Sequence, residues 1–132
     1  MKFTVLMFAA ISSLTGCSAA GLVNSSDPDV KMSQALELMK HGRKIPAERL
    51  MKEALTVFAE SSNFEGGRFA TFQLANLYSG QGKIKEACSH YDASDLQHLK
   101  AKAENPKEKY YVMALYNDWS EMVVALKNKI GC

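Results

Sequence analysis

The chain has 132 residues, of which 47% are hydrophobic and 23% are charged. This length suits one domain and leaves no room for two ordinary ones, and the composition argues against a largely disordered chain. The 16 Lys and Arg residues nearly balance the 14 Asp and Glu residues, which gives a net charge of +2. So small a net charge argues against a nucleic-acid partner, because such binding needs a strongly basic surface.

The N-terminal segment has the features of a secretory signal. Met1-Lys2 is followed by an apolar run through Ile11, and small residues then lead to Cys17. A cationic start, a short apolar stretch and a small-residue cleavage site are typical of an export signal that is removed. The apolar stretch is too short for a membrane-spanning helix, which needs about 20 residues.

Leu14-Thr15-Gly16-Cys17 resembles the lipobox of bacterial lipoproteins at all four positions. The resemblance implies that residues 1–16 are a cleaved signal peptide and that Cys17 carries acyl chains, which anchor a protein stably in a membrane. Ser18 resembles the residue that follows the lipidated cysteine in outer-membrane lipoproteins, which implies an outer-membrane anchor facing the periplasm. The alternative is an ordinary secretory signal in which Cys17 occurs by chance.

These segments divide the chain into a signal peptide (1–16), a lipidated N-terminus with its tether (17–27) and one folded domain (28–132). Cys88 and Cys132 are the cysteines that remain in the domain. An exported protein meets an oxidising compartment, where an even number of cysteines favours pairing. We therefore expect a Cys88–Cys132 disulfide, with two unpaired thiols as the alternative.

The first two expected helices follow directly after the tether. Ser26 is the expected cap of the first helix, Pro28 suits its first turn, and Gly42 ends it. Pro46 is expected to start the second helix, and Ser61 to end it. Their apolar residues recur at the spacing of a helix face: Met32, Ala35, Leu36 and Met39 in the first helix, and Ala47, Leu50, Met51, Ala54, Leu55 and Phe58 in the second.

Two more helices are expected on either side of a turn at residues 80–82. Ser62 is the expected cap of the third helix, although Gly66 and Gly67 weaken its first turn. The fourth helix begins at Ile84. Its end stays open, because residues 92–95 are either a break or a continuing polar face.

A long last helix is expected to begin at Asn105-Pro106. Its apolar positions are Val112, Met113, Tyr116, Trp119, Val123, Leu126 and Ile130. The alternating pattern that is typical of strands is nearly absent from the chain. The sequence therefore predicts an all-α fold of about five helices.

Two segments of the chain align as an internal repeat. Residues 42–47 and 82–87 both begin with a glycine and end with an alanine, so the repeat offset is the distance from Ala47 to Ala87. The pattern resembles the tetratricopeptide repeat, in which small residues let stacked helices approach closely. This offset is longer than the tetratricopeptide period of about 34 residues. A longer repeat is similar to the Sel1-like variety, and the alternative is a loop insertion at residues 61–67. The resemblance implies two tetratricopeptide-like hairpins, capped by a long C-terminal helix that buries Trp119.

Candidate reactive groups are few. Cys88, His90, Asp92, Asp95 and His98 are close in sequence, but they do not recur at the helical spacing that a shared metal ion needs. His90 lies two residues from Cys88 and points elsewhere on a helix, so a Cys–His nucleophile is not expected either. We predict no catalytic residue, no metal and no cofactor beyond the covalent lipid on Cys17.

Two surfaces are candidates for binding. In tetratricopeptide arrays the first helix of each repeat lines a groove, so the resemblance implies Phe69, Phe72 and Asn76 as residues that hold a partner segment. The alternative is that Phe69 and Phe72 pack on the first hairpin or on the last helix. A basic cluster of Lys40, Arg43, Lys44 and Arg49 either approaches anionic headgroups or is scattered surface charge.

Three functions are compatible with these features. The leading hypothesis is a non-enzymatic adaptor or scaffold for an envelope protein, anchored in the outer membrane and similar to pilotins or to envelope-assembly lipoproteins. The second is an immunity or exclusion lipoprotein that binds a toxin or a component of a transfer machine. The third, which the sequence favours least, is a small metal- or thiol-dependent enzyme.

Overall fold

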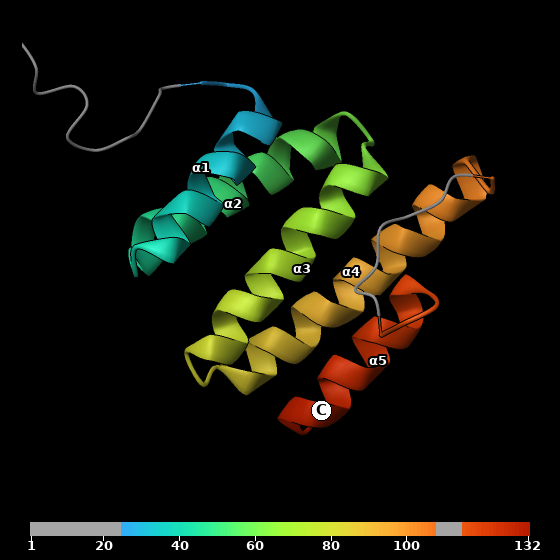
Figure 1. Cartoon of the computed structure of the whole chain (residues 1–132). Coiled ribbons are helices and arrows are strands. Elements are labelled where there is room, and N and C mark those ends of the chain that lie inside the picture. The colour runs from blue at the N-terminus through green and yellow to red at the C-terminus, as the bar shows by residue number, and fades with distance from the viewer. Residues whose placement is uncertain (1–24, 108–114) are drawn as a thin grey trace, which may run out of the picture.

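A computed structural model of the protein describes residues 25–107 and 115–132. Its five helices are α1 (Pro28–Lys40), α2 (Lys44–Glu60), α3 (Phe64–Gly80), α4 (Ile84–Glu104) and α5 (Trp119–Ile130). Each helix packs on the next one along the chain. They form two hairpins, α1–α2 and α3–α4, with α5 laid along α4 (Figure 1). The prediction of an all-α fold with about five helices is confirmed.

The turns between the first four helices share one geometry. The backbone N–H groups of Arg43, Asn63 and Lys83 donate to the carbonyl oxygens of Leu38, Phe58 and Tyr78, each at 2.9 Å. The residue before each donor is left-handed, with φ of 70° at Gly42, 52° at Ser62 and 73° at Gly82. These bonds satisfy the last carbonyl groups of each helix. The three left-handed positions are evenly spaced, so the repeat seen in the sequence consists of two helix-and-turn units of equal length.

The predicted loop insertion at residues 61–67 is wrong, because Phe64–Gly67 is the first turn of α3. The expected caps also shift by one residue. Asp27 caps α1 instead of Ser26, and Asn63 caps α3 instead of Ser62, accepting from the backbone N–H of Gly66 at 2.9 Å. The second helix starts two residues before Pro46.

The last helix is shorter than predicted. Asn105 is the C-cap of α4, with an extended φ of −138°, and the helix before it runs without interruption through residues 92–95. Asn105 precedes a proline, which disfavours helical backbone at that position, so α4 ends there, and Pro106 and Lys107 lie in a turn. The last helix starts at Trp119, where the side chain of Asp118 caps it. Val112 and Met113 lie outside the described residues.

The core runs through both hairpins and beneath α5. The helix at its centre is α3, which contacts α2 on one side and α4 on the other. Phe58 from α2 and Trp119 from α5 are among the large side chains that the core buries. The expected burial of Trp119 by the last helix is therefore confirmed.

Candidate functional site

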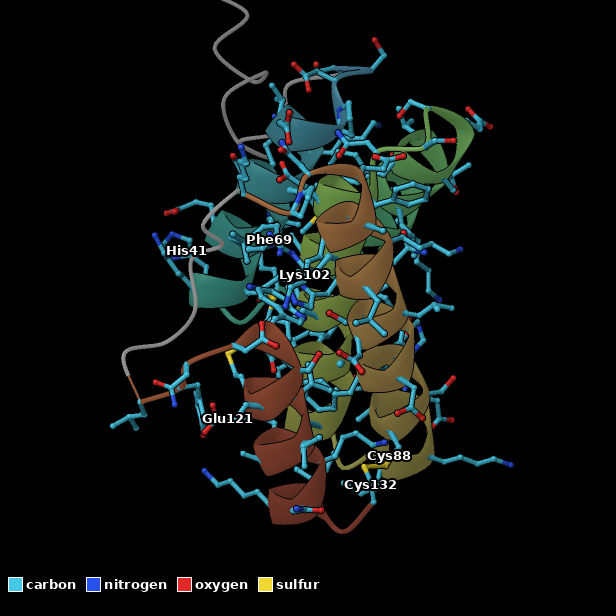
Figure 2. All side chains as sticks on the ribbon, turned by 90° about the vertical axis from the view of Figure 1, so that its right-hand side faces the viewer. His41, Phe69, Cys88, Lys102, Glu121 and Cys132 are labelled. Atoms are coloured by element: carbon cyan, nitrogen blue, oxygen red, sulfur yellow. A yellow bond between two sulfur atoms is a disulfide. The ribbon has the colours of Figure 1, made fainter. Side chains whose placement is uncertain are left out.

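The predicted groove residues do not form one surface. Phe69 is 38% exposed and points out of α3 (Figure 2). Phe72 is buried, its ring centroid 5.0 Å from that of Trp119 and 5.8 Å from that of Tyr91. Asn76 is partly buried and accepts a hydrogen bond from the Tyr91 hydroxyl at 2.6 Å. Phe72 is thus wrong as a groove residue and fits the alternative, because it packs on Trp119 of the last helix.

Two exposed leucines of α4 form an apolar surface. Leu96 is 53% exposed and Leu99 is 52% exposed. Residues three apart are neighbours on a helix surface, so the two leucines form one patch, which we call the α4 leucine pair. Sequence reasoning missed it. The available signal was two leucines at this spacing within a stretch that otherwise carries mostly polar and charged side chains.

Buried polar side chains join α3, α4 and the start of α5. The guanidinium of Arg68 donates to Nδ1 of His98 at 3.1 Å, and Nε2 of His98 lies 3.1 Å from the Asp118 carboxylate. A guanidinium can only donate, so Nδ1 accepts and the proton is on Nε2, which donates to Asp118. Burial lowers the pKa of His98, the nearby Asp118 carboxylate raises it and the Arg68 cation lowers it. The imidazole is therefore neutral at pH 7.

This arrangement resembles the His–Asp pair of a hydrolase only in its two residue types. In a general base, one ring nitrogen must be open to accept a proton from a substrate or nucleophile. Here both nitrogens of His98 are engaged, and the side chain is fully buried. The pair therefore fixes helices together and does not present a reactive group.

Trp119 also joins the start of α5 to α3 and α4. Its indole N–H donates to Oγ of Ser94 at 3.1 Å, and that hydroxyl donates to the backbone carbonyl of Arg68 at 3.0 Å. The Arg68 guanidinium lies 4.5 Å from the centre of the indole ring, close enough for a cation–π attraction. The N-terminus of α5 is thereby bonded to both α3 and α4.

A disulfide fixes the other end of α5. The structure joins Cys88 of α4 to Cys132, with Cα atoms 5.8 Å apart (Figure 2), as predicted. Lys127 also forms an ion pair with Asp92 across the same two helices. Because Cys88 is bonded, its sulfur is not a free thiolate, which is the form that acts as a nucleophile.

The candidate metal ligands of α4 are dispersed. His90 donates from Nδ1 to the backbone carbonyl of Glu86 at 2.8 Å, whereas His98 is turned inward to Asp118. Across residues 25–107 and 115–132, no three His, Cys, Asp or Glu side chains cluster in a way that could hold a metal ion.

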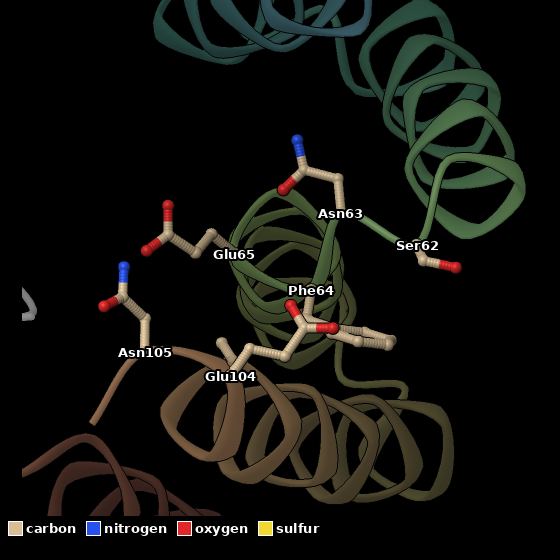
Figure 3. A pocket seen from close by; sticks show the side chains of 7 residues that line it. Ser62, Asn63, Phe64, Glu65, Glu104 and Asn105 are labelled. Carbon is tan, nitrogen blue, oxygen red and sulfur yellow. The ribbon is translucent and has the colours of Figure 1, made fainter.

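An open cleft of about 350 Å³ lies where the first turn of α3 meets the end of α4 (Figure 3). Glu65 and Glu104 bring carboxylates to it, Asn63 and Asn105 bring amides, and Phe64 contributes the aromatic side chain. Asn63 is occupied as the cap of α3. The cleft is open to solvent and its lining is mostly polar.

Comparison of the chain with protein-family models, with curated proteins and with solved structures finds no match. Among the described helices, none is both long enough and apolar enough to cross a membrane. Cys17 and the lipobox lie outside the described residues.

Proposed function

We propose that the chain is a non-enzymatic adaptor lipoprotein, anchored through Cys17 to the periplasmic face of the outer membrane. The anchor is supported by the match of Leu14-Thr15-Gly16-Cys17 to the lipobox, and its location by Ser18. The tetratricopeptide-like character of the two hairpins is part of the same proposal. It is supported by the shared turn geometry at Gly42 and Gly82.

The binding role rests on one observation, the exposure of the α4 leucine pair. Leu96 and Leu99 are adjacent and half exposed, so they form a small apolar patch, and apolar patches are candidate contacts for another protein. The buried polar side chains around His98 and the disulfide of Cys88 hold helices together. The partner we propose is an envelope protein that lays an apolar helix face against α4, since helices pack through ridges of side chains three or four residues apart.

The binding test is crosslinking in intact cells followed by mass spectrometry. Leu96→Ser with Leu99→Ser should abolish crosslinking to a specific partner. Val124→Ser changes an exposed aliphatic side chain on α5 and should leave this crosslinking unchanged. Phe69→Ser is the third variant, because it tests the predicted groove separately. A partner lost only with Phe69→Ser would move the binding site to α3, and a crosslink to a second copy of this chain would make the surface a dimer interface.

The anchor has its own test. Cys17→Ala should abolish incorporation of labelled palmitate. Ser18→Asp should move the lipidated protein from the outer to the inner membrane. Continued labelling of the Cys17→Ala variant would contradict the proposed lipid site.

A further inference from the structure

The two hairpin tips carry the same kind of surface. Lys44-Ile45 follows the left-handed Gly42, and Lys83-Ile84-Lys85 follows the left-handed Gly82. All five side chains are exposed, with Ile45 at 83% and Ile84 at 36%. Each tip therefore presents an isoleucine next to lysine, an arrangement that core packing does not require.

Both tips lie at one end of the molecule, together with the C-terminus (Figure 1). The Tyr78 hydroxyl, near the end of α3, donates to Glu48 in the second turn of α2 at 2.6 Å, which connects the two tips. The Cys88–Cys132 disulfide ties the end of the chain to the first turns of α4. We call this surface the basic end; its exposed cationic residues are Lys40, Arg43, Lys44, Lys83, Lys85 and Lys129.

Acidic side chains neutralise only part of the charge at this end. Glu37 pairs with Lys40 and with His41, and Glu48 is engaged by Lys52 and Tyr78. Glu86 is the remaining acidic residue in the first turn of α4. The opposite end holds the carboxylates of Asp27, Asp29, Glu60, Glu65 and Glu104, together with Lys100, Lys102 and Lys107. The excess of positive charge therefore lies at the basic end.

The N-terminal ends of α2 and α4 also lie at the two tips. The N-caps of α2 and α4 are Arg43 and Lys83, and neither makes a side-chain capping bond. By contrast Asp27, Asn63 and Asp118 cap α1, α3 and α5 with side-chain oxygens. Cations at the positive end of a helix dipole are unfavourable for the helix itself. Within the chain, Lys83 lies 5.7 Å from the centre of the Tyr78 ring, and Lys40 is in the last turn of α1, where a cation is favourable.

We propose that the basic end binds the surface of a bilayer that contains anionic lipids. Lysine and arginine side chains contact the headgroups, and Ile45 and Ile84 enter the boundary between headgroups and acyl chains. A bilayer fits better than an acidic protein segment, because the charges are spread over separate tips with an exposed aliphatic side chain at each. Interfacial binding depends on these two contributions, buried apolar area and attraction to anionic lipid.

This contact is independent of the lipid on Cys17 and of the α4 leucine pair. It is also compatible with an anchor at the other end of the domain. The 17 residues of α2 extend about 26 Å, and the stretch 17–27 can reach at most roughly 36–40 Å when extended. A chain held at Cys17 can therefore place its basic end on the same bilayer.

The test uses the full chain with Cys17→Ser, so that no acyl chain is attached. Its partition is measured between water and vesicles of phosphatidylcholine, with or without about one third phosphatidylglycerol, which supplies the anionic surface. The quantity of interest is the ratio of the two partition coefficients, because the apolar residues 3–11 are present in both measurements. We expect the anionic vesicles to bind at least about tenfold more tightly, and high salt to remove this preference.

The variants locate the contact. Lys44→Gln with Lys85→Gln should lower the anionic preference by about fivefold or more, since each Lys near an anionic surface contributes about 1 kcal/mol. Lys102→Gln with Lys107→Gln removes the same charge from exposed positions at the other end and should change the preference less than about twofold. Ile45→Ser with Ile84→Ser should weaken binding to both kinds of vesicle.

Two results would overturn the proposal. One is an equal loss in the tip variant and in its control, which would mean that only net charge matters. The other is binding to soluble polyglutamate without any preference for anionic vesicles, which would assign the basic end to an acidic protein segment. Thermal unfolding of each variant checks that the substitutions at these exposed positions leave the fold intact.

Discussion

Gly66 lies directly against the ring of Phe58: a Cβ atom built on Gly66 would stand 2.3 Å from two of its carbon atoms. The ring belongs to α2 and the glycine to the first turn of α3. Gly67 has a similar role, since its Cβ would meet the side chain of Gln97 on α4 at 2.9 Å. The glycine pair that weakens α3 as an isolated helix lets three helices approach one another.

Gly66→Ala should therefore destabilise the protein by about 2–3 kcal/mol, because the buried Phe58 ring must shift to make room. Gly80→Ala is the matched control within the same helix, where no atom lies within 4 Å of the added Cβ. We expect it to be neutral or to stabilise the protein by up to about 1 kcal/mol through the unfolded state. Urea unfolding of both variants measures the difference, and equal effects would contradict the close approach.

Ser62 holds the left-handed position of the second turn, which glycine holds in the other two. A residue with a Cβ atom loses about 1 kcal/mol or more in that conformation. We expect Ser62→Gly to stabilise the protein by up to about 1 kcal/mol, and Gly82→Ser to destabilise it by a similar amount. Thermal and urea unfolding test both. A Ser62→Gly variant less stable than the parent would contradict the shared turn geometry.

The stability of the protein should fall as the pH drops from 7.5 to 5.5. Burial is the main reason why the pKa of folded His98 lies below the 6.5 of the unfolded chain. The unfolded state therefore takes up the proton first, so the contribution of His98 is complete above pH 6.5 and is lost as the pH falls toward the lowered pKa. A pKa of His98 that is lower by one in the folded state corresponds to a contribution of about 1.4 kcal/mol to the free energy of unfolding.

Titration of His98 by NMR checks this directly. Asp118→Asn should lower the pKa of His98 further, because the carboxylate is the main group that favours the charged imidazole. A His98 that titrates above 6.5, or a free energy of unfolding that rises toward pH 5.5, would contradict the neutral, buried assignment.

Reduction of Cys88–Cys132 should destabilise the protein by up to about 4 kcal/mol, on the chain-entropy estimate for a separation of 44 residues. Unfolding is compared with and without a reductant, with Cys17→Ser in every sample so that only this pair responds. The double variant Cys88→Ser with Cys132→Ser should resemble the reduced protein and be insensitive to the reductant. A reductant that leaves the parent unchanged would contradict the bond.

Helical periodicity was sufficient to predict most of the architecture. The stripe from Ala47 to Phe58 identified α2, and Ile84 was the correct start of α4. The errors came from local signals with two meanings. Ser62 resembles a cap, but Asn63 is closer to the first free N–H groups, and Asn105-Pro106 has the composition of a helix start although it ends α4.

The candidate site was harder to predict, because it depends on which face of each helix remains uncovered. Phe69 and Phe72 are equivalent in sequence terms, yet α5 covers only the second. The network of Arg68, His98 and Asp118 joins three segments that are far apart along the chain. No periodicity within a single helix can indicate such a contact.

The packing of each helix on its chain neighbour has a consequence for how the protein folds. Contacts between neighbouring elements close only short loops, and chains dominated by them fold within microseconds to milliseconds. The disulfide differs, since Cys88 and Cys132 meet only after α5 has settled on α4. Thiol oxidation takes seconds or longer, so we expect the chain to fold first and the disulfide then to lock a structure that already exists.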